Sequence, residues 1–218
     1  MKRKTVLKAA AAAFLILIAA ALAFVLVLLF ASPKPDPHAK AGGWEEHAAE
    51  LRPGDLVFRM GTVTDSRVIA KVSGSSYSHV GMVIEIWPEI LVAHATTSDH
   101  DYDRDEASIT TLKDFWSKAL ASAGAAGRVS GLGDEQVKKV ISRLISDKGR
   151  PFVLAPRNEK HFYCSTMLYE AIREADPSFD LSWKNLSYPG FSGEYLFPQS
   201  FIASLRVHLL FAFTRKDG

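Results

Sequence analysis

The sequence predicts an α+β domain, a small antiparallel sheet or partial barrel packed on helices, preceded by one transmembrane helix. Two observations predict the domain: apolar stretches on either side of Trp87-Pro88-Glu89 have the pattern of a β-hairpin, and the second half of the chain contains amphipathic helical repeats. The third observation is an apolar run from Ala9 to Ala31. The chain has 218 residues. About 180 remain beyond this run, enough for one domain with a core over residues 51–218.

The N-terminal run is long enough to cross a bilayer. A spanning helix needs about 20 residues, whereas the apolar region of a secretory signal has about 7–15. Basic residues at Lys2 to Lys4 and Lys8 precede it, which favours a cytoplasmic N-terminus. We therefore expect a single-pass protein of the inner (cytoplasmic) membrane with an anchor over residues 1–31 and an extracytoplasmic domain. A cleaved signal peptide is the alternative. Residues 32–50, rich in Pro and Gly, predict an extended linker.

Composition narrows the possible partners. The formal net charge is +2, so the chain lacks the dense basic character expected of a protein that binds nucleic acid, and we expect no such partner. Cys164 is the only cysteine, which excludes an intrachain disulfide and draws attention to the thiol. Extracytoplasmic placement points to cell-envelope material, either peptide or lipid-acyl, as substrate.

The elements follow from local pattern, taken in order along the domain. A Pro-Gly turn at Pro53-Gly54 leads into an apolar strand over 54–59, and spaced apolar residues over 64–72 predict a short helix. The hairpin follows. Beyond it we expect a strand-like start and a helical turn over 109–120, an irregular Ala/Gly-rich stretch over 121–133, a helix capped by Asp134 and closed at Lys148-Gly149, a helix starting at or just after Cys164, a loop with a short helix over 191–201, and a closing strand over 207–213.

A histidine stands at each outer end of the hairpin. His79 and His94 are an odd number of positions apart, so an even-length loop projects both from the same face. A four-residue loop over 85–88 would set them directly opposite, and a two-residue loop at Pro88-Glu89 would slide them apart. Two such imidazoles could act as a base and its orienter, or as metal ligands.

Cys164 supplies the third group. At a helix N-terminus, the first-turn N–H groups favour a thiolate and could stabilise an oxyanion. If that N-terminus packs against the histidine face of the sheet, His79 within reach would complete an activated nucleophile. A catalytic zinc site formed by His79, His94 and Cys164 is a chemical alternative. The other alternative is that Cys164 is a buried structural thiol without a chemical role.

An acidic stretch between residues 99 and 105 has alternating aspartates, as a calcium loop does. However, Arg104 stands where the turn glycine is needed, and Thr110 stands where the bidentate glutamate belongs. A solvated acidic loop is therefore the expectation.

Four segments together resemble the permuted papain-like branch of the NlpC/P60 superfamily, specifically the YiiX/YaeF-like amidases and peptidases. They are Gly54-Asp-Leu-Val-Phe58, Ser76-Tyr-Ser-His-Val-Gly-Met-Val83, Leu91-Val-Ala-His-Ala95 and Phe162-Tyr-Cys-Ser-Thr-Met-Leu-Tyr169, in the family's order with histidine before cysteine. The resemblance covers about residues 51–213.

The resemblance implies a circularly permuted papain-like fold, no metal and no cofactor. It makes Cys164 the nucleophile, His79 the general base and acid, and His94 the orienting third residue. A second histidine is similar to the lecithin:retinol acyltransferase-like cousins, whereas YiiX-like relatives commonly have a glutamate there. Tyr77, Tyr163 and His161 flank these positions as possible pocket residues.

The expected function is therefore that of a membrane-anchored cysteine hydrolase, an amidase or peptidase that works through an acyl-enzyme. Two alternatives stay open. One is an acyltransferase or thioesterase-like enzyme that modifies lipids on the same fold, and the other is a non-catalytic envelope-binding module.

Overall fold

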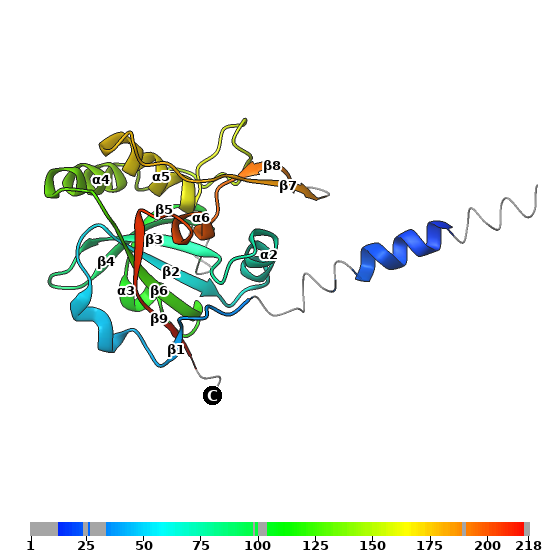
Figure 1. Cartoon of the computed structure of the whole chain (residues 1–218), viewed down its shortest axis with the longest axis horizontal. Helices are drawn as coiled ribbons and strands as arrows, with labels where there is room; N and C mark the ends of the chain where they lie inside the picture. Colours follow the sequence, from blue (N-terminus) through cyan, green and yellow to red (C-terminus); the bar gives the residue numbers. More distant parts are fainter. Residues whose placement is uncertain are drawn as a thin grey trace, which may run out of the picture.

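The structure is a computed structural model that describes residues 13–23, 26, 34–97, 99, 104–188 and 191–215. Residues 13–23 are helical and project away from the domain (Figure 1). Within the described residues no helix is both long enough and apolar enough to cross a membrane. The rest of the predicted span, at 9–12, 24–25 and 27–31, lies outside them. The anchor stays a prediction.

The domain is built on a seven-stranded sheet in the order β1-β9-β6-β2-β3-β4-β5. All pairs are antiparallel except β1 with β9. The strands are β1 (Lys40–Ala41), β2 (Asp55–Gly61), β3 (His79–Glu85), β4 (Leu91–Thr96), β5 (Glu106–Thr111), β6 (Ala121–Val129) and β9 (Val207–Thr214), and β7 (Lys184–Tyr188) pairs with β8 (Phe191–Tyr195) in a separate hairpin. The helices are the 3-10 helix η1 (Glu45–Glu50), α2 (Thr64–Ser73), α3 (Leu112–Phe115), α4 (Asp134–Ser146), α5 (Cys164–Ala175) and α6 (Pro198–Ile202).

Most of these elements match the sequence expectations. The predicted α+β class, the helix that starts at Cys164 and the closing strand are all present. Asp134 is the first residue of α4 rather than its cap, because Gly133 holds the N-cap position and its N–H donates to Gln136 Oε1 at 2.9 Å. The stretch before α6 is the strand β8 rather than a loop.

The prediction of an irregular stretch over 121–133 is wrong, because residues 121–129 form β6, a central strand paired with β2 and β9. Its small side chains reflect close packing. A Cβ on Gly124 would lie 2.6 Å from Phe213 Cε1 and 2.7 Å from Trp116 Nε1. The indole Nε1–H of Trp116 donates to the carbonyl of Phe58 at 2.9 Å across this space. Tertiary packing thus overrides the weak strand propensity of Ala and Gly.

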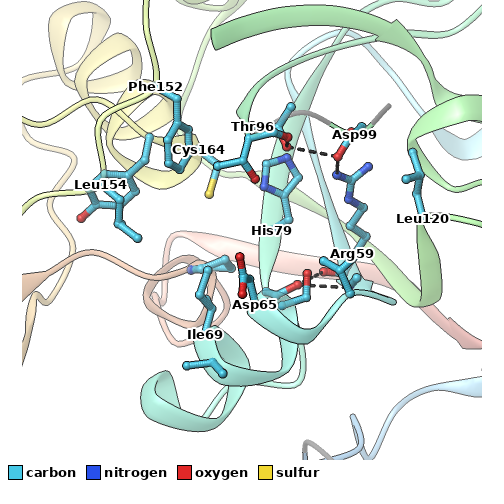
Figure 2. A pocket seen from close by; sticks show the side chains of 18 of the residues that line it. Arg59, Asp65, Ile69, His79, Thr96, Asp99, Leu120, Phe152, Leu154 and Cys164 are labelled. Carbon is cyan, nitrogen blue, oxygen red and sulfur yellow. Dashed lines mark hydrogen bonds and ion pairs between the residues drawn. The ribbon is translucent and has the colours of Figure 1, made fainter. Parts of the chain in front are cut away.

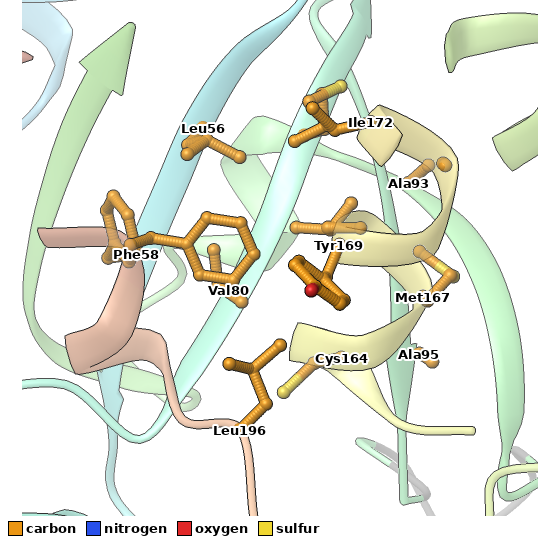
Figure 3. Packing of buried hydrophobic residues seen from close by; sticks show 14 of the residues in the cluster. Leu56, Phe58, Val80, Ala93, Ala95, Cys164, Met167, Tyr169, Ile172 and Leu196 are labelled. Atoms are coloured by element: carbon orange, nitrogen blue, oxygen red, sulfur yellow. The ribbon is translucent and has the colours of Figure 1, made fainter. Parts of the chain in front are cut away.

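The two faces of the sheet carry different layers. On one face, α5 buries its apolar stripe, including Met167, Leu168 and Ile172, in one cluster with Leu56 and Val80. Figure 3 shows Met167 beside Ala93 and Ala95 in this cluster. On the other face, a second cluster gathers around Trp116. Strand alternation assigns the rings of the two histidines to this second face, since His79 shares its parity with Val83 and His94 with Val92. The apolar stripe of α5 covers the opposite face, so the helix as a whole does not pack on the histidine face.

The predicted linker over residues 32–50 contains ordered structure where it is described. Lys40–Ala41 adds to the sheet as β1, and η1 follows. The ring of His47 stacks on Phe211 with centroids 4.5 Å apart. The polar and small residues of this segment give no strand or helix signal of their own. Its structure depends on contacts with β9, which pairs with β1 and carries Phe211.

The packing at Gly124 gives a first test. Gly124→Ala should lower the free energy of unfolding by about 1–3 kcal/mol, because its methyl group meets Phe213 and Trp116. Gly42→Ala is the control, since an added Cβ there has nothing within 4 Å. Chemical denaturation of the whole chain measures both. Equal stabilities for the two variants would contradict this account of β6.

Candidate active site

A cavity of about 350 Å³ lies where the N-terminal tip of α5 meets the end of the sheet. Cys164 and His79 both line it, and in Figure 2 the sulfur and the imidazole point into it from neighbouring walls. His79 is the first residue of β3. The cysteine on one layer and the histidine on the other therefore reach the same cavity at the end of the strand.

The two histidine rings are in direct contact. His79 Nε2 lies 2.9 Å from His94 Nδ1, and the ring planes are inclined by 82°. The register pairs Met82 with Ala93, so neither loop length considered from the sequence is the actual one. A bulge between Val83 and Glu85 shifts the strands, and the histidines become diagonal neighbours. The prediction that they share a face is confirmed.

The chain of ring contacts continues to a residue that the sequence did not single out. His94 Nε2 lies 3.1 Å from Thr110 Oγ1. When each ring donates its Nε2–H, His79 to His94 and His94 to Thr110, the Nδ1 of His79 keeps its lone pair. That nitrogen is then free to take the thiol proton. Thr110 stands on β5 opposite Val92 and hence on the histidine face.

Arg59 is the second residue missed by sequence reasoning. It pairs with His79 across β2 and β3, is 5% exposed and lines the cavity. Its Nη2 donates to Asp99 Oδ1 at 2.6 Å and its Nη1 to the carbonyl of Phe115 at 3.2 Å. The Phe115 ring packs against both histidines, with centroids 5.7 and 5.2 Å away. A buried cation thus sits beside the imidazole pair. Only its strand position, alternating with core residues, hinted at this.

Burial and Arg59 set the protonation of the site. Burial lowers the pKa of His79 well below its ordinary value, with Arg59 and His94 adding to the effect. Burial and Arg59 also lower the pKa of His94 to about 3. Burial raises the pKa of the Cys164 thiol, against the opposing effects of Ser165, the backbone N–H of Val80 and Arg59. The raised thiol pKa contradicts the expectation that Cys164 rests as a thiolate. The resting site holds a thiol beside neutral imidazoles, because desolvation outweighs the helix field.

The other predicted pocket residues divide. Tyr163 lines the cavity, and its hydroxyl accepts from the N–H of Leu196 at 2.8 Å. Tyr77 is instead buried in the core, and its hydroxyl donates to Asp36 Oδ2 at 2.7 Å. His161 does not line the cavity; its ring packs on Trp183 and on Tyr163, with centroids 5.5 and 6.1 Å apart.

Metal binding can be judged from the donor atoms. Among the described residues, no group of three or more His, Cys, Asp or Glu side chains is placed to hold a metal ion. His79 Nε2 and His94 Nδ1 are hydrogen-bonded to each other, so these two nitrogens are not available as metal ligands in this arrangement. Of the aspartates considered for calcium, Asp99 pairs with Arg59. Asp101 and Asp103 lie outside the described residues.

Comparison with solved structures shows the fold. The chain is similar to the crystal structure of the metalloprotein YiiX from Escherichia coli O157:H7, DUF1105, with a TM-score of 0.60 and 19% sequence identity. The match covers 73% of this chain and 96% of that one. The chain therefore has a YiiX-like α+β fold. No family model matches the sequence. No curated protein matches it either.

The protonation state predicts how the thiol responds to pH. A raised thiol pKa makes thiolate scarce below that pKa, and lowered histidine pKa values leave no imidazolium to hold it. The rate of Cys164 alkylation by iodoacetamide should therefore climb from neutral to alkaline pH, without the plateau at about pH 5–7 that an ion pair gives. Arg59→Gln should move the climb to higher pH, and Arg59→Lys should not. A plateau in acid would contradict the neutral pair.

Thr110 predicts a graded effect on the base. Thr110→Val keeps the shape but removes the acceptor for His94 Nε2–H, at a cost of about 1–3 kcal/mol for the unpaired group. Acylation of Cys164 by a 4-nitrophenyl ester, followed by nitrophenolate release, should slow by about tenfold or more. Thr110→Ser keeps the hydroxyl and serves as the control. If Thr110→Val and the unmodified protein acylate at the same rate, the hydrogen bond from His94 to Thr110 plays no part in orienting the base.

Proposed function

We propose that this protein is a membrane-anchored cysteine hydrolase that cleaves an amide or ester of cell-envelope material through an acyl-enzyme on Cys164. The observation that carries the proposal is the shared cavity, in which Cys164 and His79 both stand and His79 is held by His94. The order of these residues along the chain is that of the permuted papain-like enzymes, of the NlpC/P60 superfamily, that the sequence resembles. The YiiX-like fold agrees with it.

The reaction follows from the neutral resting state. The Cys164 sulfur attacks the substrate carbonyl carbon as its proton passes to His79 Nδ1. First-turn N–H groups of α5 stabilise the oxyanion. The carbon–nitrogen or carbon–oxygen bond then breaks, and the leaving group takes the proton from His79. Water next gives a proton to the same nitrogen and attacks the thioester carbon. The carbon–sulfur bond then breaks, the sulfur takes the proton back from His79, and a carboxylic acid is released.

His94 holds His79 in place during this cycle. When His79 becomes imidazolium, its Nε2–H still donates to His94 Nδ1. His94 supplies no negative charge, so it stabilises the imidazolium less than a carboxylate would. Arg59 favours the developing negative charge on sulfur. The proposed site thus lacks a negative charge at the third position, His94, and has instead a cation, Arg59, that favours the thiolate.

A second candidate function is supported by the walls of the cavity. Leu120, Phe152, Leu154, Phe191 and Phe197 all line it. Such a lining suits an acyl chain better than a charged wall peptide. The same acyl-enzyme could then pass its acyl group to an amine or alcohol in place of water, which is the reaction of an acyltransferase.

Adduct mass tests the proposal directly. The full-length protein, incubated with envelope extract, should gain an acyl mass on Cys164 that hydroxylamine removes. Cys164→Ser should lose the hydroxylamine-sensitive adduct, and His79→Ala should lower its rate of formation by about 10²–10⁴-fold, the usual contribution of a positioned base.

His208→Ala is the matched control, because His208 is an exposed residue of β9 away from the residues that line the cavity. Transfer of the adduct to added amine in preference to water would favour the acyltransferase. Absence of any adduct, with the protein folded, would leave the non-catalytic envelope-binding module.

A further inference from the structure

The chain between the predicted anchor and the domain is fastened at residue 36. Tyr77 is fully buried, and its hydroxyl donates to Asp36 Oδ2 at 2.7 Å. Burial and Asp36 together raise the pKa of Tyr77, so the hydroxyl keeps its proton. Asp36 Oδ1 also accepts from the N–H of His38 at 2.8 Å. We call residues 36–50, from this bond through β1 and η1, the strap.

The strap continues along the sheet. Lys40 pairs with Phe213 in β9, and the N–H of Gly42 donates to the carbonyl of Thr214 at 3.1 Å. Its far end, η1, bears His47, whose ring stacks on Phe211. Because attachments recur along its length, the strap belongs to the domain and does not act as a free tether.

The tie at Asp36 limits how far the domain can stand from a membrane. The predicted anchor ends at Ala31, five residues before Asp36. Five extended residues span at most about 17 Å. Tyr77, at the other end of the tie, is only two residues before His79 in the chain. A domain anchored in this way keeps its catalytic cavity within a short distance of the bilayer surface.

The mouth of the cavity carries exposed apolar side chains. Val63, at the start of α2, is 60% exposed, and Leu154, on the loop before α5, is 36% exposed. Both line the cavity, and Ile69 and Leu154 border it in Figure 2. The described chain leaves the domain on the side that carries α2 (Figure 1). Exposed apolar groups at the rim of an apolar cavity fit a lipid surface.

We propose that the cavity takes its substrate directly from the bilayer, and that the strap holds the mouth there. The substrate class is an acyl-bearing amphiphile, whose chain lies along the apolar wall while its amide or ester carbonyl meets Cys164. This inference rests on the proposed hydrolase and its anchor. A water-soluble envelope peptide, which would approach from the opposite phase, is the competing outcome.

Cys164 is the only cysteine in the chain, so it can report which phase reaches it. Full-length protein is placed in nanodiscs of phosphatidylethanolamine and phosphatidylglycerol. One sample receives N-hexadecylmaleimide dissolved in the bilayer, and another receives a sulfonated, water-soluble maleimide. The test variant carries about twenty Gly/Ser residues inserted after Ser32, which adds about 25 Å of root-mean-square reach. The control carries the same insert after Gly218.

The expected result is selective. The insert after Ser32 should slow modification by the bilayer reagent by about tenfold or more, because the local concentration of reagent at the mouth falls. Modification by the water-soluble reagent should be unchanged, and the C-terminal insert should change neither rate. Tyr77→Phe, which loses the tie to Asp36, should slow the bilayer reagent in the same direction.

Two results would overturn the inference, and they differ in meaning. Equal rates for the bilayer reagent with and without the insert after Ser32, while the water-soluble reagent still reacts, would refute access from the membrane and leave the hydrolase standing. Failure of both reagents on folded protein would remove the reactive thiol, and the proposed function would fall together with this inference.

Discussion

The hydrogen bond between His79 Nε2 and His94 Nδ1 is the interaction on which the rest of the site depends. It exists because a bulge in the pairing of β3 with β4 sets the two residues as diagonal neighbours on one face. It occupies one nitrogen of His79 and thereby determines which nitrogen can serve the cysteine. Thr110 completes the chain and Phe115 packs against both rings, so the orientation of His79 is fixed on several sides.

Desolvation determines the chemistry at this site. A histidine pair buried beside Arg59 stays neutral, and a buried thiol keeps its proton. In the proposed hydrolase, the thiol proton therefore moves to His79 as the sulfur attacks, and no standing ion pair is needed. The same burial excludes water and shapes an apolar cavity, so the conditions that keep the groups neutral also suit an acyl substrate. In the proposed mechanism, burial thus accounts for both the proton transfer and the choice of an acyl substrate.

Sequence reasoning reached the features that local pattern encodes. The helix that begins at Cys164, the hairpin and the shared face of His79 and His94 follow from periodicity and parity, and the structure has them. It failed where distant contacts decide. The Ala/Gly-rich residues of β6 have little strand propensity and become a strand only between two partners.

The candidate site shows the same limit. Thr110 and Arg59 carry no local mark of function, because their roles come from neighbours brought by the register of β5 and β2. The loop bulge that sets the histidine register is invisible in composition. The helix position and a nearby histidine led to the expectation of a lowered thiol pKa. The burial that outweighs both effects depends on the assembled layers and cannot be read from local sequence. The strap was missed for a related reason, as Asp36 is placed only by the buried hydroxyl of Tyr77.

The protonation of the two histidines is the most direct test of this account. Nitrogen-15 spectra of histidine-labelled protein, with His79→Gln and His94→Gln used for assignment, report which ring nitrogen carries the proton. We predict that both residues remain neutral through the neutral pH range, each with its proton on Nε2, so that Nδ1 of His79, the nitrogen not bonded to His94, is unprotonated. A doubly protonated His79 at neutral pH, or a neutral ring with its proton on Nδ1, would contradict the account.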